Sequence, residues 1–340
     1  MVTTICSYLL GSDPEIRQKL AKQLGKKATS SDITLYSYDK EYALEIVDPI
    51  RYPDKPLVLF QTILMADVPI IVITSTGIDI HTGEFGILLD ALKYSNGIVV
   101  VAHDGDYVDF EEISENFKKL FKDMVIKDYP ILDIDLSKGE DLTLLKQTII
   151  QQNEQKIDRK WSEANQSRVD IDHVFPVTGV GTVILGRVRA GTLSKGETLH
   201  VFPSKRNCVL RSIQINDIDY TTATAGQRVG LALRGLLPKD VERGFLLSNQ
   251  VNWTITTEID VKLEVAPYSK LPEEGKMRHL IVGLQAVPAT IISCAPVKEG
   301  QSDSYLIKLK LDRKIVVHTK EPAFLIDLNG KPKTIGYCNL

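Results

Sequence analysis

The sequence predicts a chain of mixed class, with an α/β half followed by an all-β half. Up to about residue 155, apolar runs alternate with helical patterns, as in the βαβ units of a parallel sheet. From Val169 onward glycine, proline and β-branched residues dominate and turn signals recur every few residues, as in small barrels. A length of 340 residues with 43% hydrophobic side chains suits two or three domains.

The first half contains apolar runs that predict strands, separated by stretches with helical spacing. Pro14 is expected to begin the first helix, with Ser12 or Asp13 as its N-cap and Gly25 at its end. Two later helices place charges between apolar residues at three-to-four spacing, so both should pack on the sheet. The predicted strands are 3–10, 42–47, 70–74, 97–102 and 131–136, and the predicted helices are 15–24, 110–121 and 142–152.

The second half is punctuated by glycines where a barrel must turn. In residues 179–203, GVGTVILGRVRAGTLSKGETLHVFP, the glycines separate short runs of branched and apolar residues that fit pleated strands. The polar segment before it predicts a linker. We therefore predict an α/β domain over 1–155, a linker over 156–168, and β-barrels over 169–252 and 256–340, with a last strand at 334–338.

Apolar runs, cysteine spacing and charge indicate in which compartment the protein works and which partners it binds. No apolar run approaches the roughly 20 residues that span a bilayer, and no signal peptide is recognisable, so we expect a cytoplasmic protein without a membrane partner. The four cysteines form no C-x-x-C pair, which argues against a zinc site or a disulfide framework. Residues 1–160 carry a net charge of −8 and the remainder +5, so phosphate contacts are expected in the barrels.

Two motifs in register carry a family resemblance. Residues 179–203 and the run AGQRVGLALRGLLPKDVERGFLLSN at 225–249 resemble the second domain of the elongation factor Tu family. Residues 258–340, which include LIVGLQAVPATIIS and end in EPAFLIDLNGKPKTIGYCNL, resemble the third domain, most closely that of the archaeal selenocysteine-specific factors. The resemblance implies a P-loop GTPase-like doubly wound domain followed by two β-barrels. Because no residues remain for the RNA-hairpin-reading fourth domain of selenocysteine factors, we expect no role in recoding.

The phosphate-binding loop of this family departs from its pattern here. The pattern G-x-x-x-x-G-K-[ST] begins at Gly11, but Ile16, Arg17 and Gln18 stand where it requires Gly, Lys and Ser or Thr. Asp13 adds negative charge beside the expected phosphates. These changes oppose the binding of a triphosphate and of its magnesium ion.

The loop that would sense the third phosphate is also changed. Asp48 is retained, but Arg51 replaces a glycine and Tyr52 replaces the catalytic His. We interpret Asp48 as a turn residue that caps its own backbone, with a metal ligand as the alternative. For Arg17 we favour a solvated helical arginine over a ligand for an isolated phosphate.

The guanine-reading motifs have weakened in the same way. His103 follows Ala102 where Asn and Lys are expected, although Asp104 or Asp106 is placed to reach a base. Ser137 and Lys138 resemble the S-A-K loop. Gly11, Asp13, Arg17, Asp48, Ser137 and Lys138 are thus degenerate nucleotide-site positions. We predict a pseudo-GTPase with no catalytic residue, no metal and no cofactor, with GTP and magnesium as the alternative.

The resemblance implies that the barrels bind tRNA or the ribosome, and not DNA. Arg211 and Arg234 are expected to flank strand ends near the aminoacyl pocket, while the alternative is that barrel arginines pair with acids such as Asp240 or Glu242. A divergent GTP-binding factor, or a module whose acidic first domain docks on another translation factor, are the other hypotheses. The candidate RNA or aminoacyl ligands are His173, Arg187, Arg189, Lys205, Arg206, Arg211, Arg234 and Arg243.

Overall fold

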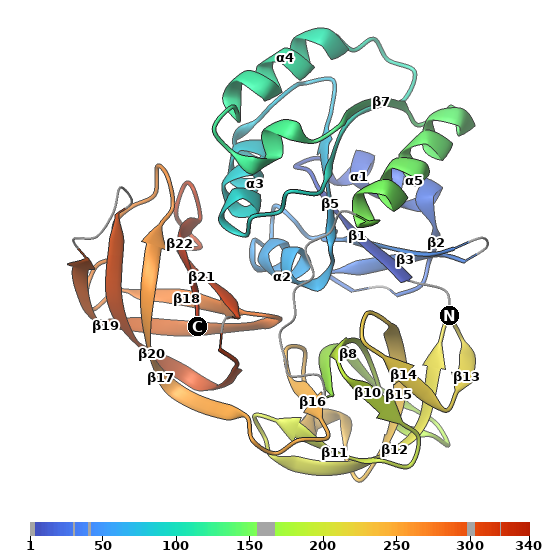
Figure 1. The fold of residues 1–340 in the computed structure, drawn as a ribbon, viewed down its shortest axis with the longest axis vertical. Coiled ribbons are helices and arrows are strands. Elements are labelled where there is room, and N and C mark those ends of the chain that lie inside the picture. The colour runs from blue at the N-terminus through green and yellow to red at the C-terminus, as the bar shows by residue number, and fades with distance from the viewer. Residues whose placement is uncertain (1–3, 30, 40–41, 155–166, 298–302, 320) are drawn as a thin grey trace. The chain divides into compact units, whose positions relative to one another are not determined.

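The computed structural model describes residues 4–29, 31–39, 42–154, 167–297, 303–319 and 321–340. The chain divides into two compact units, Met1–Asp158 and Arg159–Leu340 (Figure 1). Each unit has hydrophobic cores of its own.

The first unit is a seven-stranded sheet in the order β2-β3-β4-β1-β5-β6-β7, parallel except for β2 and β3. Helices α1 and α5 pack together on one face of the sheet, and α2 and α3 lie on the other (Figure 1). The strands are β1 Thr4–Leu10, β2 Lys26–Lys27, β3 Thr34–Asp39, β4 Ala43–Asp48, β5 Val68–Ile73, β6 Ile98–His103 and β7 Ile131–Asp135. The helices are α1 Pro14–Leu24, α2 Leu57–Met65, α3 Ile80–Ala91, α4 Phe110–Leu120 and α5 Gly139–Glu154, with a 3₁₀ turn at Val125–Asp128.

The central strands of this sheet are buried on both faces because helices cover both. Strands β4 and β5 are buried along their whole length, which matches the unbroken apolar sequence of β5, whereas β4 also buries Glu45 and Asp48. The five predicted strands and three predicted helices all occur, with ends shifted by up to three residues. Strands β2 and β3 and helices α2 and α3 carried no predicted bounds.

The first part of the second unit is a closed ring of six strands. The order β11-β16-β8-β9-β15-β12 returns to its start because β12 also pairs with β11, while β13 extends β12 and β10 pairs with β14. Gly186 is required where β9 crosses β8, since a Cβ there would lie 2.5 Å from the carbonyl oxygen of Asp170. The strands are β8 Arg168–Val177, β9 Gly181–Ala190, β10 Thr192–Ser194, β11 Thr198–Phe202, β12 Arg206–Ile215, β13 Ile218–Tyr220, β14 Thr222–Thr224, β15 Arg228–Arg234 and β16 Leu246–Ser248.

The second part is a closed six-stranded barrel in the order β17-β20-β19-β18-β21-β22. The predicted fold, a doubly wound α/β domain followed by two barrels, is confirmed. The domain boundaries given above stay a prediction. The strands are β17 Thr254–Val265, β18 Met277–Val282, β19 Gln285–Val297, β20 Ser304–Val317, β21 Pro322–Ile326 and β22 Thr334–Asn339.

A buried charge network joins the two barrels within the second unit. Arg168 on β8 donates from Nε to Asp170 at 2.7 Å and from Nη2 to Glu321 at 2.6 Å. Asp170 also accepts from Arg189 at 3.1 Å, and the Arg168 guanidinium stands over the ring of Trp253 at 5.7 Å. Burial alone lowers the pKa of Arg168, but the charges of Asp170 and Glu321 outweigh it and raise that pKa. The arginine is therefore charged, and its Nε and Nη2 are bonded between the barrels, whereas its Nη1 is buried and meets no hydrogen-bond partner among the described residues.

Candidate functional site

The N-terminus of α1 is occupied by the chain itself. The side chain of Asp13 accepts hydrogen bonds from the backbone N–H groups of Glu15 at 2.8 Å and Ile16 at 3.1 Å, which confirms the predicted N-cap. Free N–H groups at a helix N-terminus are what a phosphate would bind. Here a carboxylate already takes two of them, and its negative charge repels a second anion.

Arg17 lies inside the protein, so the interpretation of a solvated helical arginine is wrong. Its side chain is 0% exposed. Its Nε donates to Oδ1 of Asp48 at 2.9 Å, and Nη2 donates to the carbonyl oxygens of Pro49 at 2.9 Å and Tyr52 at 3.2 Å. Nη1 donates to the carbonyl oxygen of Gly11. A buried guanidinium is stable only when it is hydrogen-bonded, and these four oxygens accept from four of its five N–H groups.

Asp48 ends β4 and is also fully buried. The interpretation of a residue whose side chain caps its own turn is wrong, because that side chain binds Arg17 instead. Burial raises the pKa of Asp48, and the charge of Arg17 opposes this rise. Its second oxygen, Oδ2, is buried and meets no hydrogen-bond partner among the described residues. The retained acidic residue thus faces a cation supplied by the chain.

Tyr52, which stands where the family has its catalytic His, is buried against α3. Its hydroxyl lies 2.7 Å from Nδ1 of His81, and its ring lies 5.7 Å from that of Phe85. Burial, followed by the charges of Glu84 and Asp79, raises the pKa of Tyr52. The phenol therefore stays neutral and packs as a core side chain, a role the sequence alone did not signal.

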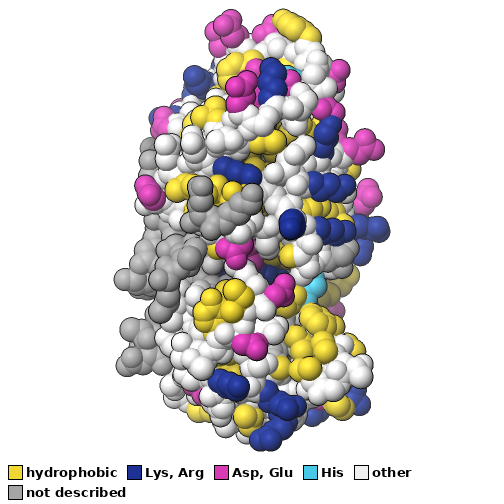
Figure 2. All heavy atoms as spheres, turned by 90° about the vertical axis from the view of Figure 1, so that its right-hand side faces the viewer, with side chains coloured by type: hydrophobic (Ala, Val, Ile, Leu, Met, Phe, Trp, Pro, Cys, Tyr) yellow, Lys and Arg dark blue, Asp and Glu magenta, His cyan; other side chains and the backbone are white. Residues whose placement is uncertain are grey.

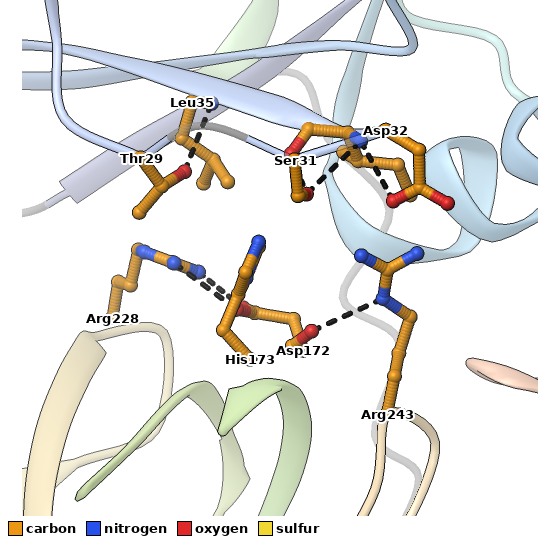
Figure 3. Close-up of polar contacts among 9 residues, drawn as sticks. Thr29, Ser31, Asp32, Leu35, Asp172, His173, Arg228 and Arg243 are labelled. Carbon is orange, nitrogen blue, oxygen red and sulfur yellow. Dashed lines mark hydrogen bonds and ion pairs between the residues drawn. The ribbon is translucent and has the colours of Figure 1, made fainter. Parts of the chain in front are cut away.

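Local hydrogen bonds hold the described residues that precede β3. The backbone N–H of Ile33 donates to the side chains of Ser31 at 3.2 Å and Asp32 at 3.1 Å, and that of Leu35 donates to Thr29 at 3.2 Å (Figure 3). These local bonds fix the backbone without any ligand.

At the carboxyl ends of β6 and β7 the side chains are engaged with one another. His103 lies 3.1 Å from Asp133, and Asp104, a predicted base contact, pairs with Lys19. In the next loop Oδ1 of Asp135 accepts from the hydroxyl of Ser137 at 2.7 Å and from its backbone N–H at 3.0 Å, while Lys138 lies 3.5 Å from Oδ2. These hydrogen bonds from Ser137 lower the pKa of Asp135 to about 2. Ser137 and Lys138 are therefore brought together, around an acid rather than a free site.

Half of the predicted barrel ligands are buried or half-buried. Nδ1 of His173 lies 2.5 Å from Asp172, and Arg243 donates to the carbonyl oxygen of Asp172 at 3.1 Å. Arg189 belongs to the network around Asp170 described above, and Arg187 is buried. For Arg189 the alternative of acid pairing is confirmed.

The other half is exposed: Lys205, Arg206, Arg211 and Arg234. Arg206 pairs with Asp240 at 3.3 Å. Arg234 ends β15, as predicted. Arg211 does not flank a strand end, because it lies inside β12, where the pairing of β12 with β15 shifts register between Leu210 and Ser212. In the face drawn in Figure 2, Lys and Arg side chains are interspersed with hydrophobic, acidic and uncharged ones, so the visible described residues form no single basic surface.

One strong ion pair of the barrel was not foreseen. Both terminal nitrogens of Arg228 on β15 donate to the carboxylate of Asp172 on β8 (Figure 3). Burial would raise the pKa of Asp172, but Arg228 and the hydrogen bond from His173 lower it to about 2. The two residues are 56 positions apart, so nothing local in the sequence signalled the pair.

Within the described residues, no group of three or more His, Cys, Asp or Glu side chains is arranged to hold a metal ion. The helices of the described part also lack the length and apolar character that a membrane crossing needs.

Comparison with known proteins agrees with this architecture. Residues 181–248 match the family model of elongation factor Tu domain 2. An uncharacterized protein of Methanocaldococcus jannaschii is 36% identical over 322 residues, which cover 93% of this chain and 94% of that protein. The chain therefore belongs to the translational GTPase family.

Two relatives with assigned names also match over most of the chain, at lower identity. The selenocysteine-specific elongation factor of Methanocaldococcus jannaschii is 28% identical over 342 residues, covering 93% of this chain and 71% of that factor. Translation elongation factor SelB from Methanococcus maripaludis, solved in complex with the GTP analogue GppNHp, matches with a TM-score of 0.86 at 22% identity and covers 100% of this chain and 79% of its own. At 22% identity, the likeness to this solved structure shows the fold alone.

Proposed function

We propose that the chain is an elongation factor-like pseudo-GTPase of the cytoplasm that binds tRNA or the ribosome through its barrels without GTP. The observation that carries the proposal is the buried Arg17–Asp48 pair, in which an arginine of the expected phosphate loop binds the acid that would be the metal ligand. A triphosphate and its metal would have to displace this pair and the Asp13 cap together. The absent catalytic His, replaced by a buried Tyr52, argues in the same direction.

The RNA part of the proposal concerns the exposed side chains of β12 and β15. Arg234 lies opposite Val209 in the antiparallel pair, two residues before Arg211 on β12. Arg211 and Arg234 therefore lie near each other along the same strand pair. Exposed arginines of this kind bind phosphate oxygens and release counterions, which makes the affinity depend on salt.

Two titrations test the proposal. Isothermal titration with GTP or GDP, with and without magnesium, should give no binding heat. Binding of tRNA, measured over a series of salt concentrations, should weaken as salt rises. Replacing Arg211 and Arg234 together by Ala should reduce the slope of log affinity against log salt by about 2, or about 1 per phosphate contact.

The matched control replaces two exposed lysines of the other barrel, Lys310 and Lys314, by Ala, and leaves the slope unchanged. A magnesium-dependent heat of GTP binding would instead support a divergent GTP-binding factor. Absence of RNA binding, together with a stable complex with a purified elongation factor, would support an interaction module.

A further inference from the structure

The acceptors around Arg17 form an oxygen cage that the chain supplies by itself. Three of them are backbone carbonyl oxygens, of Gly11, Pro49 and Tyr52, and the fourth is Oδ1 of Asp48. Carbonyl and carboxylate oxygens are the groups that bind hard cations in proteins. Here the cation is a guanidinium, whose planar fork supplies a donor for each oxygen.

The cage connects segments that are distant in the sequence. Gly11 follows β1, whereas Asp48, Pro49 and Tyr52 belong to the end of β4 and the loop after it. Within this loop Tyr52 donates its backbone N–H to Pro49 at 2.8 Å, so the two carbonyl-bearing residues are also joined to each other. One side chain on α1 therefore holds the whole loop to β1.

The side chain of Tyr52 makes a second contact that anchors the same loop. The hydroxyl of Tyr52 lies 2.7 Å from His81, and its ring packs edge-on to the imidazole at 5.4 Å. The loop is thus fixed through its backbone by Arg17 and through a side chain by α3. Neither contact requires a nucleotide.

We infer that the Arg17 guanidinium is a built-in cation that fixes the Asp48–Tyr52 segment, and that a free guanidinium ion binds the same cage when the Arg17 side chain is removed. The inference deepens the proposed function and rests on it in one respect, namely that no nucleotide binds beside Arg17. It does not depend on RNA binding.

The decisive variant is Arg17→Ala, which leaves the four oxygens in place and opens a volume the size of the lost side chain. Loss of a buried ion pair partner should lower the melting temperature by about 10 °C. Guanidinium chloride, at a concentration far below the denaturing range, should raise the melting temperature of Arg17→Ala, whereas sodium chloride and urea at the same concentration should not. The wild-type protein should not gain stability from guanidinium.

The control variant is Arg51→Ala, which removes an exposed arginine from the same loop without touching the cage. It should keep the wild-type melting temperature and show no response to guanidinium. Arg17→Lys, which keeps the charge but cannot reach four oxygens at once, should fold and show faster exchange of the Tyr52 amide hydrogen than the wild type.

If Arg17→Ala is recovered only unfolded, its refolding yield with and without guanidinium becomes the measurement, and an equal yield overturns the inference. Equal melting temperatures of Arg17→Ala in guanidinium and in sodium chloride also overturn it, as does wild-type exchange at Tyr52 in Arg17→Lys. These results are obtained without nucleotide. Binding of GTP to the wild type would overturn the proposed function and leave the rescue result standing.

Discussion

Replacement of Arg168 by Met should destabilise the second unit by about 4 kcal/mol. The substitution keeps an unbranched side chain of similar length but removes a buried cation that bonds Asp170 at 2.7 Å and Glu321 at 2.6 Å. Asp170 keeps Arg189, whereas Glu321 remains buried without its cation. Breaking a buried ion pair costs roughly 3–5 kcal/mol, and the lost stacking on Trp253 adds up to about 1 kcal/mol.

Urea unfolding followed by Trp253 fluorescence, in a Trp161→Phe background, measures this loss. With a slope of about 2–3 kcal/mol/M, the midpoint should fall by between about 1 and 2 M. Arg313→Met is the matched control, since Arg313 also pairs across the two barrels, with Glu242 at 2.8 Å, but is half exposed. Its loss should cost less than about 1 kcal/mol.

Adding Glu321→Gln to Arg168→Met should recover part of the lost stability, because it removes the unpaired buried charge. The reasoning fails if Arg168→Met costs no more than Arg313→Met. It also fails if Glu321→Gln makes the Arg168→Met variant less stable still.

Three further changes test other features. The pKa of Asp172 is lowered from 3.8 to about 2, so its ionised carboxylate should stabilise the second unit above pH 4, and about 2 kcal/mol of that stability should be lost as the pH falls to about 2. Urea titrations of the wild type and of Asp172→Asn over this pH range measure the loss. An equal pH dependence of stability in both proteins refutes it. Gly186→Ala should cost about 1–3 kcal/mol by overpacking against Asp170, whereas Gly230→Ala, on the neighbouring strand β15, should cost less in urea unfolding of the second unit, because a Cβ there meets no atom nearer than 3.5 Å. Asp13→Ala should cost about 1 kcal/mol by loss of the α1 cap, with Asp13→Asn retaining most of it; equal thermal stabilities of the two variants would contradict the capping role.

The sequence could predict the elements whose signal is local. The start of α1 follows from Pro14 and the Asp13 side chain, which bonds a backbone two and three residues away. Helix α2 could not be assigned in this way, because LVLFQTILM is a short apolar run with no helical stripe, which suits a buried strand equally well. Helix α3 contains Gly83 and Gly86, which weaken any helical signal.

The sequence could predict which motif residues the site lacks, but not which contacts the substituted residues make. Reading motifs position by position identified Arg17 and Tyr52 as departures from the family. Their actual contacts join residues 31 and 29 positions apart, Arg17 to Asp48 and Tyr52 to His81. Such pairs form only when the sheet brings β1, β4 and the start of α3 together, so a single sequence without its fold assigns both arginine and aspartate to the surface or to turns.

The Arg168 network also decides how the chain can be divided for biochemical work. A truncation between Ser248 and Thr254 would separate Arg168 and Asp170 from Glu321, and would expose the faces of Phe202, Leu246 and Val316 that pack around Trp253. Each isolated piece would then carry an unpaired charge and an exposed apolar surface that are buried in the intact second unit. The smallest fragment suited to expression and crystallisation from this half of the chain is therefore the pair of barrels kept together.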